Sequence, residues 1–430
     1  MLQAFMLSIA TLWSSSIYQN GDIGLKIDLP TESRVSSTSK SPPFCMISSS
    51  NPSNIWHLRL ERGINPNAKT ANELLNVPQD DYFSDHQAVI ENRSMFAGAV
   101  EGWLHAIEQR GAENPLVIVR FALPIDGDQF ILATGRFLRS SWDTNTETIL
   151  NCMQSIRPLD PVKLVRDKLK GLENSTTILS SLNKDILKPL IGFQEWRRIQ
   201  SNEEDIGYAL VQVSTGNIEE VEIRDGQEDL AKTGIIVTVR SRLLPNEATG
   251  VVIDSFGRYW VSWDGKESRW SNRVTRWLEK AKATESETGI RNRPEIGSPK
   301  SRIIVIQQDL TSDIIKPPFK GLAEDPWLPR AFVWVLGPLL ASGDHDSTYI
   351  WMTYENSNEQ QIIATRTDSL HADDNGNWTI ETHVGEGEVI LWSTFDSQGS
   401  LLKQVQKDGA IVTGTTPETL RAIWEPKNLW

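Results

Sequence analysis

The sequence predicts an α+β protein with two parts. An N-terminal antiparallel sheet with flanking helices is followed by a larger, mostly-β antiparallel meander with an inserted helix. Apolar and polar residues alternate with a period of two along most of the chain, which is typical of strands. Near residues 142–156 the period changes to that of an amphipathic helix, and after residue 205 short turns rich in Asp, Asn and Gly join the runs. Because an open sheet of that width leaves long edges, we expect a curled sheet or half barrel.

Composition restricts the class of protein. The chain has 430 residues, of which 39% are hydrophobic, so it can bury more than one core. Its formal net charge of -13 argues against nucleic acid as a partner, because phosphate backbones are bound by clustered Lys and Arg. We divide the chain into a candidate signal peptide at 1–17, an α+β domain at 18–161, a helical linker at 162–204 and a β-rich meander domain at 205–430.

The first residues resemble a secretory leader. An apolar run from Ala4 to Trp13 is followed by the small residues Ser14 to Ser16, although no Lys or Arg precedes it. The run has the length of a signal-peptide core and is too short to span a bilayer. We therefore expect export to the periplasm or cell envelope, with the cytoplasm as the alternative. No transmembrane span is expected, since no other stretch reaches the roughly 18 apolar residues that one needs.

The N-terminal part alternates strand patterns with two helix patterns. Thr70 is the expected N-cap of a short helix over 70–77, and residues 31–43 are expected to form a polar connection. A longer helix is expected from Trp142, with Ser140 or Ser141 as its cap and Pro158 as its stop. Strands are expected at 24–30, 54–63, 98–109, 115–125 and 129–137.

This order of elements, over about residues 18–161, resembles the PsbP, Mog1 and DcrB superfamily. The likeness depends on Gly135, which lies on a strand, and on a following helix that ends in the sequence from Ser155 to Arg157. The resemblance implies an adaptor or assembly fold without catalytic residues. It also implies a protein partner for this domain.

The second part begins with helical patterns between residues 161 and 201, followed by the meander. Helices are also expected at 271–285 and 417–424. The meander, over about residues 205–425, is similar to the unclosed barrels of the LolA and LppX kind, which implies a lipid or lipoprotein acyl chain as its ligand. Its twelve expected strands are 207–217, 235–244, 250–254, 258–263, 301–307, 332–337, 348–355, 361–369, 377–385, 388–396, 400–407 and 410–414.

The aromatic segment 251–270 is interpreted as a hairpin, with carbohydrate or lipid contact as the alternative. Tyr259 and Trp260 point to opposite faces of one strand, which favours a strand covered on both sides. Residues 254–257 and 264–265 are expected to be turns because Asp and Gly favour them.

Few residues point to chemistry. The sequence has no GxSxG elbow and no phosphate-binding glycine loop, so we expect neither an enzyme nor a cofactor. Asp344, His345 and Asp346 form the only dense Asp and His cluster, but its spacing does not predict a metal site. Cys45 and Cys152 are interpreted as buried thiols, with a disulfide as the alternative in an exported protein.

The sixteen tryptophans are spread over both parts, which favours packing over a single site. We name Trp277, Trp327, Trp334 and Trp351 as candidate ligand-binding residues. Three functions remain open. The first is a non-enzymatic, exported binding or assembly protein with a lipid or other apolar ligand, the second is a structural or interaction protein without a ligand, and the third is a hydrolase that uses Asp344, His345 and Asp346.

Overall fold

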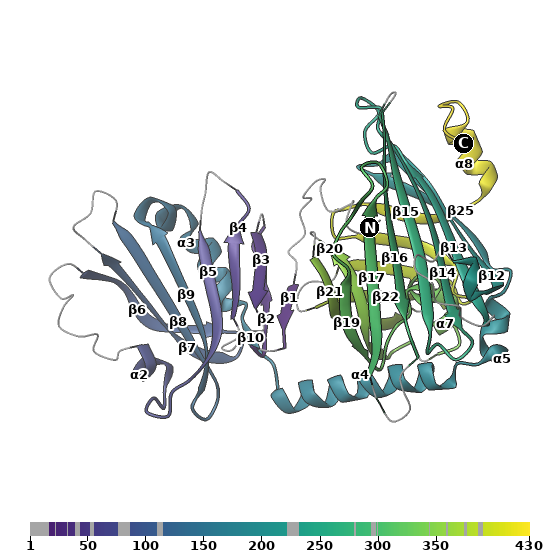
Figure 1. The fold of residues 1–430 in the computed structure, drawn as a ribbon. Coiled ribbons are helices and arrows are strands. Elements are labelled where there is room, and N and C mark those ends of the chain that lie inside the picture. The colour runs from purple at the N-terminus through teal and green to yellow at the C-terminus, as the bar shows by residue number, and fades with distance from the viewer. Residues whose placement is uncertain are drawn as a thin grey trace. The chain divides into compact units, whose positions relative to one another are not determined.

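The computed structural model describes residues 17–430 except 22, 32, 39–43, 52–55, 76–86, 110–114, 222–231, 279–280, 294–297, 299, 344, 358–359, 374–375 and 386–389. The candidate signal peptide therefore lies outside the described residues, apart from Ile17. The described chain forms two compact units, an N-terminal unit that ends at Arg166 and a C-terminal unit that begins at Asp167 (Figure 1). It is α+β, with antiparallel sheets in both units and few helices.

The N-terminal unit contains a seven-stranded sheet in the order β3-β4-β5-β9-β8-β7-β6 and a small sheet in the order β1-β2-β10. Both sheets are antiparallel. The elements are β1 (Ile17–Asn20), β2 (Leu25–Asp28), β3 (Ser33–Thr38), β4 (Phe44–Ser49), β5 (His57–Ile64), α2 (Ala71–Leu75), β6 (Gln87–Ala97), β7 (Val100–Gln109), β8 (Leu116–Asp126), β9 (Gln129–Leu138), α3 (Arg139–Gln154) and β10 (Arg157–Pro158).

The two expected helices of this unit are confirmed. Glu73 N donates to Thr70 Oγ1 at 3.2 Å, so Thr70 caps α2 as expected. Helix α3 buries Trp142 and the apolar stripe that predicted it. The expected Ser140 or Ser141 cap is wrong, because the helix already begins at Arg139, which forms an ion pair with Asp143 one turn later. The helix ends at Gln154, before Pro158.

Strands β3, β4 and β6 were not expected. Residues 31–43 looked like a connection because they are rich in Ser and Thr, but β3 pairs with β4 along six residues. A strand at the edge of a sheet has a neighbour on one side only, so polar side chains are tolerated there. Strand β6 forms the opposite edge and is similarly polar.

The segment after residue 161 is helical only in its first part. It contains α4 (Pro161–Ser181), α5 (Lys184–Leu187) and the 3₁₀ helix η2 (Lys188–Leu190). The expected helical character up to residue 201 is wrong, because β11 (Gln194–Ser201) is a strand. Glu195, Arg197 and Ile199 are buried on one face of it, so the period here is two. No helix among the described residues is long and apolar enough to cross a membrane.

The C-terminal unit contains one 15-stranded antiparallel sheet. Its path is β18-β17-β16-β15-β14-β13-β12-β11-β25-β24-β23-β22-β21-β20, and β19 pairs with β17. Besides β11, the elements are β12 (Glu204–Asn217), η3 (Ile218–Glu220), β13 (Thr233–Leu243), β14 (Val252–Ser262), β15 (Ser268–Leu278), β16 (Ala281–Arg291), β17 (Lys300–Asp309), β18 (Ile314–Ile315), β19 (Phe319–Glu324), α6 (Arg330–Val333), α7 (Leu336–Leu340), β20 (Thr348–Ser357), β21 (Gln360–Ala372), β22 (Trp378–Val384), β23 (Leu391–Phe395), β24 (Leu401–Gln406), β25 (Ile411–Thr415) and α8 (Pro417–Trp424).

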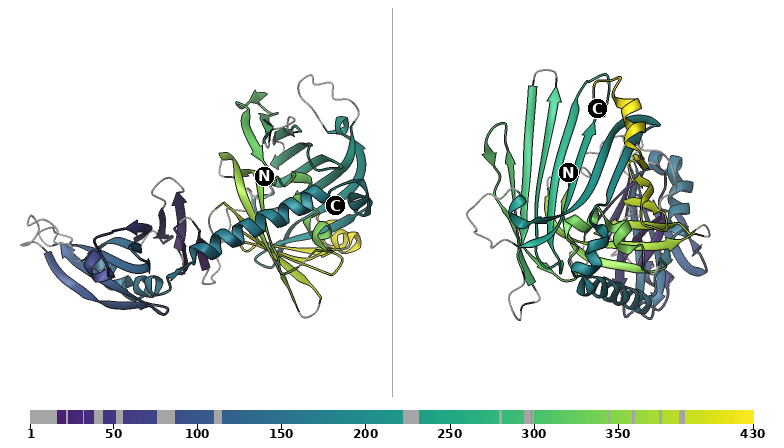
Figure 2. Two further views of the ribbon diagram at one scale, coloured as in Figure 1. Left: turned by 90° about the horizontal axis from the view of Figure 1, so that it is seen from below. Right: turned by 90° about the vertical axis from the view of Figure 1, so that its right-hand side faces the viewer.

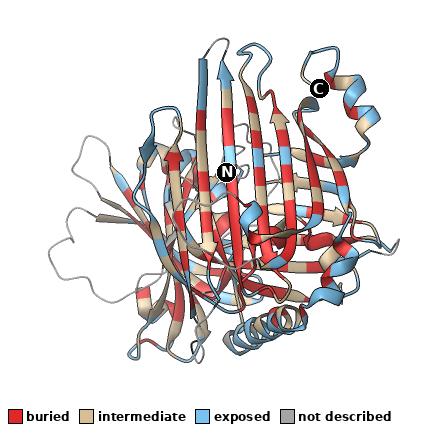
Figure 3. Cartoon of the chain, turned by 45° about the vertical axis from the view of Figure 1, so that its right-hand side comes forward, coloured by how far each residue is buried: buried red, intermediate tan, exposed pale blue. Residues whose placement is uncertain are grey.

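This sheet curls around a common interior (Figures 1 and 2). The segment after β19 meets β20, where Leu328 N donates to Met352 O at 2.9 Å and Met352 N donates to Pro326 O at 2.7 Å. Buried residues alternate with more exposed ones along the long strands (Figure 3), which is the pattern that predicted them. Strands from both halves of the sheet therefore supply side chains to one core.

For two segments the expected type of secondary structure is wrong: one expected helix is a hairpin, and one expected strand is helical. The expected helix at 271–285 is wrong, because these residues form the β15–β16 hairpin with Arg276 paired to Glu285. The expected strand at 332–337 is also wrong, since α6 and α7 lie there. A short apolar run does not distinguish a buried strand from a buried helix by its period; here Pro329 directly precedes α6 and Pro338 lies in the first turn of α7. The inserted helical segment therefore lies between β19 and β20.

Residues 251–270 form the expected hairpin, built from β14 and β15. Tyr259 and Trp260 are both buried, so the strand is covered on both faces. Gly265 has a φ of +69°, which fits the expected turn at 264–265. The expected turn at 254–257 is wrong, because this segment is the middle of β14. A Cβ on Gly257 would lie 2.7 Å from the Tyr259 ring, so this glycine permits close packing.

Candidate functional site

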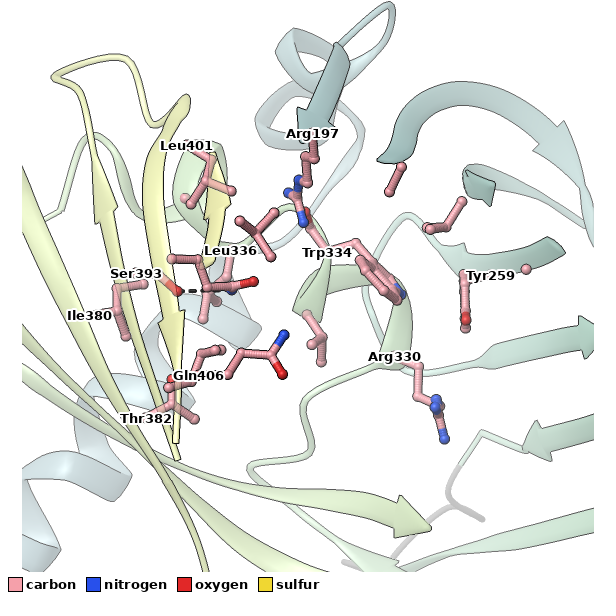
Figure 4. A pocket seen from close by; sticks show the side chains of 18 of the residues that line it. Arg197, Tyr259, Arg330, Trp334, Leu336, Ile380, Thr382, Ser393, Leu401 and Gln406 are labelled. Atoms are coloured by element: carbon pink, nitrogen blue, oxygen red, sulfur yellow. Dashed lines mark hydrogen bonds between the residues drawn. The ribbon is translucent and has the colours of Figure 1, made fainter. Parts of the chain in front are cut away.

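A cavity of about 130 Å³ lies inside the C-terminal unit. Strands β11 to β15 line one side of it and strands β20 to β25 line the other, with α6 and α7 contributing from the insertion. In Figure 4, Arg330, Trp334 and Tyr259 lie on one side of the pocket and Ile380, Thr382 and Gln406 lie on the other. The cavity is therefore a consequence of the curl that brings the two halves of the sheet together.

Much of the cavity lining is apolar. These apolar side chains come from seven strands and from the inserted helical segment, so apolar surface surrounds much of the space. Such a surface favours the apolar body of a ligand over water. The residues are Ile199, Ala209, Val239, Val333, Trp334, Leu336, Ile380, Leu391, Phe395, Leu401 and Val412.

Arg366 supplies the first of three buried ion pairs at the cavity. Its Nε and Nη2 atoms donate to Asp368 Oδ1 at 3.1 and 2.9 Å. Asp368 is fully buried and also accepts hydrogen bonds from Trp351 Nε1 at 3.0 Å and from Thr382 Oγ1 at 2.6 Å. These bonds compensate the carboxylate for its lost water, which a buried charge requires.

Arg330 and Glu287 form the second pair. Arg330 Nη1 donates to Glu287 Oε1 at 3.3 Å, and the guanidinium lies 5.3 Å from the centre of the Tyr354 ring. Glu287 also accepts from Trp270 Nε1 at 3.0 Å, Tyr354 Oη at 3.2 Å and Asn356 Nδ2 at 2.8 Å. Burial opposes ionisation of Glu287, but Arg330 and these hydrogen bonds hold its pKa below the usual value.

The third pair joins Arg197 to Glu195 on β11. Arg197 Nε donates to Glu195 Oε2 at 2.6 Å, and Arg197 Nη2 donates to the carbonyl oxygen of Trp334 at 3.3 Å. Glu195 Oε1 accepts from Leu401 N at 2.7 Å. This pair therefore links β11 to the inserted helices and to β24.

Glu355 differs from the other three carboxylates. It lines the cavity, and no side chain of the described residues forms a hydrogen bond with its carboxyl group. Burial raises its pKa, although Arg330 and Arg366 oppose the rise. Part of its surface is still accessible because it faces the open cavity. Glu355 is therefore a carboxyl group that a molecule inside the cavity can reach.

Only one of the four candidate tryptophans lines this cavity, namely Trp334. Trp351 is buried beside it and donates to Asp368. Trp327 is buried under the guanidinium of Arg291, 5.5 Å from its ring centre. Trp277 is 39% exposed, and its indole donates to Asp254 at 3.1 Å. The structure does not gather the four indoles into one site.

His345 and Asp346 of the Asp and His cluster do not line the cavity. Asp344 lies outside the described residues, and His345 stacks on Trp378 with ring centres 4.5 Å apart. In the part of the chain that the structure describes, no three His, Cys, Asp or Glu side chains form a group able to hold a metal ion.

The two cysteines are free thiols in the core of the N-terminal unit. Burial raises the pKa of both Cys45 and Cys152 to about 12.

The charged lining residues were not recognised from the sequence, yet a signal for them exists. Arg366 and Asp368 lie two residues apart on the face of β21 that also carries the buried Ala364 and Leu370. A charged pair on the apolar face of an alternating strand indicates a buried ion pair rather than solvated charge.

Comparison with known proteins adds little about function. No family model and no curated protein matches the sequence. Among solved structures, the chain is similar to cyanobacterial PsbP (CyanoP) from Synechocystis sp. PCC 6803, with 11% identity and a TM-score of 0.27. The match covers 35% of this chain and 97% of that protein. A likeness at this TM-score carries no argument about the fold or the activity of this chain.

Proposed function

We propose that the protein is a non-enzymatic binding protein whose C-terminal unit holds one small molecule. The observation that carries the proposal is an internal cavity with partly apolar walls, into which Glu355 opens a carboxyl group that has no hydrogen-bond partner among the described residues. Pockets that combine apolar surface with polar groups that fix the orientation of a molecule are typical ligand sites. A structural protein without a ligand is less well supported, because its interior would be filled by its own side chains.

The size of the cavity limits the ligand. An apolar cavity of about 150 Å³ accepts one benzene molecule, whereas drug-sized ligands occupy about 300–1,000 Å³. The cavity of about 130 Å³ therefore favours a ring-sized molecule over the long acyl chains that the LolA and LppX resemblance implied.

A hydrolytic role has less support. The hydroxyl of Ser393, which lines the cavity, accepts a hydrogen bond from Gln404 Nε2 at 3.0 Å instead of pairing with a base. His345 stacks on Trp378 away from the lining. Export and a protein partner of the N-terminal unit remain predictions of the sequence.

The proposal is tested by titrating the full chain with three ring-sized probes of similar shape: benzoate, benzyl alcohol and benzylamine. We expect calorimetry to show at least one probe binding once per chain. Ala209→Leu fills the cavity from β12 and should weaken binding at least about tenfold. Ala283→Leu, on an exposed position of β16, is the matched control and should leave binding unchanged. Binding of none of the probes, or equal binding by Ala209→Leu, would contradict the proposal.

A further inference from the structure

The Arg330 guanidinium has unused hydrogen-bonding capacity inside the cavity. A guanidinium carries five N–H donors. Within the described part of the chain, Arg330 donates one hydrogen bond, to Glu287. About a fifth of its side chain, 19%, is accessible, and the residue lines the cavity. A molecule in the cavity that carries hydrogen-bond acceptors can therefore reach donors that the described residues leave free.

Three carboxylates at the cavity are each paired with an arginine, whereas the carboxyl group of Glu355 has no arginine of its own. Arg366 pairs with Asp368, Arg330 with Glu287, and Arg197 with Glu195. Each pair is neutral, so the charges of the described residues at the cavity nearly cancel when Glu355 is protonated and leave one excess negative charge when it is ionised. A cationic ligand would match the ionised form, but it would leave the free donors of Arg330 without acceptors and would lie beside two guanidinium groups.

Within the described part of the chain, the charged groups that face Glu355 come from three elements. They are Arg330 on α6, Arg366 on β21 and Glu287 on β16. Burial already raises the pKa of Glu355, and a second carboxylate in the same space raises it further because two adjacent like charges cannot both stay ionised. An anionic ligand therefore binds together with a proton, which is taken from the solvent and held on Glu355.

From this arrangement we infer that the ligand is a small carboxylic acid with an apolar, ring-sized body. The inference rests on the proposed binding function. The ligand carboxylate accepts hydrogen bonds from Arg330, and the protonated Glu355 donates one to the same carboxylate. The apolar body lies against the aliphatic lining. Binding takes up one proton per molecule wherever Glu355 is ionised in the empty protein.

The test compares the same three probes as a function of pH. Benzoate should bind most tightly, and above the pKa of Glu355 its affinity should fall about tenfold per pH unit, because the competent, protonated form is depleted. Benzyl alcohol should bind more weakly, with less dependence on pH, and benzylamine should bind least.

Glu355→Gln mimics the protonated side chain and should remove the dependence on pH. At about pH 8 it should bind benzoate at least about tenfold more tightly than the wild type. Glu285→Gln, at a half-exposed carboxyl on the same sheet that does not line the cavity, is the matched control and should bind benzoate as the wild type does. Both substitutions are isosteric, and thermal unfolding verifies that each variant is folded.

The outcomes separate the two proposals. Tighter binding of benzylamine than of benzoate, or an unchanged benzoate affinity in Glu355→Gln, overturns the carboxylic acid inference while the binding function stands. Binding of none of the probes overturns the binding function itself.

Discussion

The cores of the two units differ in kind. In the N-terminal unit, strands and helix α3 bury an apolar core in which Leu58, Leu104 and Ile149 are fully enclosed. In the C-terminal unit, the core includes three arginine–carboxylate pairs around an internal cavity. The described core of the N-terminal unit is thus hydrophobic, whereas that of the C-terminal unit holds ion pairs beside open space.

This difference indicates where function lies. A hydrocarbon core needs only apolar residues of suitable volume. Buried ion pairs are costly to desolvate, and apolar replacements are often equally stable, so such pairs are weak devices for stability alone. Charges held in fixed positions beside a cavity are instead what a specific ligand requires.

The largest expected effect concerns the buried pairs. Asp368→Ala leaves Arg366 buried without its partner and should lower the unfolding free energy by about 3–5 kcal/mol. The control is Glu61→Ala, which breaks the partly exposed Arg59–Glu61 pair of the N-terminal unit. It should cost about 0–1 kcal/mol. Urea unfolding followed by fluorescence measures both, and equal losses would contradict the contrast between the cores.

The strand pattern of the sequence predicted much of this architecture. Alternation identified β12, β13 and β20 to β25, because one face of each strand meets the core. It divided β14 into two strands, since Asp254 and Gly257 have the composition of a turn. It assigned helix to 271–285 because apolar residues there also recur at a helical spacing.

The site was less predictable, for a physical reason. Glu355 and Arg366 lie on the adjacent strands β20 and β21, whereas Arg330 comes from the inserted helix α6 and reaches the same cavity only in the folded chain. A sequence shows which face of a strand a residue occupies, but not which distant residue lies opposite. Aromatic residues drew attention because they are numerous, yet of the four named only Trp334 lines the cavity.

The second effect concerns replacement of a small core residue by a larger one. This replacement should lower the unfolding free energy in the N-terminal core and raise it in the C-terminal core. Ala133→Leu inserts atoms beside Phe121 in the filled N-terminal core and should cost about 1–3 kcal/mol. Ala209→Leu extends into the cavity and should raise the unfolding free energy by about 1 kcal/mol. Both are measured by denaturant unfolding. A loss of similar size in both variants would show that the cavity is not open space.

A smaller effect on stability concerns pH. Because the pKa of Glu355 is raised on folding, its contribution to stability is fully present below the unfolded-state pKa of about 4.3. It is lost as the pH rises through the folded-state pKa. Glu355→Gln should therefore be more stable than the wild type near neutral pH, and the two should converge in acid. A stability difference between Glu355→Gln and the wild type that grows as the pH falls would contradict the predicted direction.

The smallest effect concerns the two thiols of the N-terminal core. Cys45 and Cys152 are buried, and their pKa of about 12 leaves little thiolate at about pH 8. Native protein should therefore react negligibly with a chromogenic disulfide reagent, whereas urea-unfolded protein should react at both thiols. Rapid reaction of the folded protein would show that this core is less tightly closed than its packing indicates.

The most direct test of the central claim, that the curled sheet holds one ring-sized molecule, is a crystal structure of the protein soaked with 4-bromobenzoate. We predict one bromine anomalous peak inside the cavity, against the aliphatic lining near Val239 and Leu336, with the carboxylate within hydrogen-bond distance of Arg330. A cavity without ligand density at saturating concentration, or bromine peaks confined to the surface, would contradict the account.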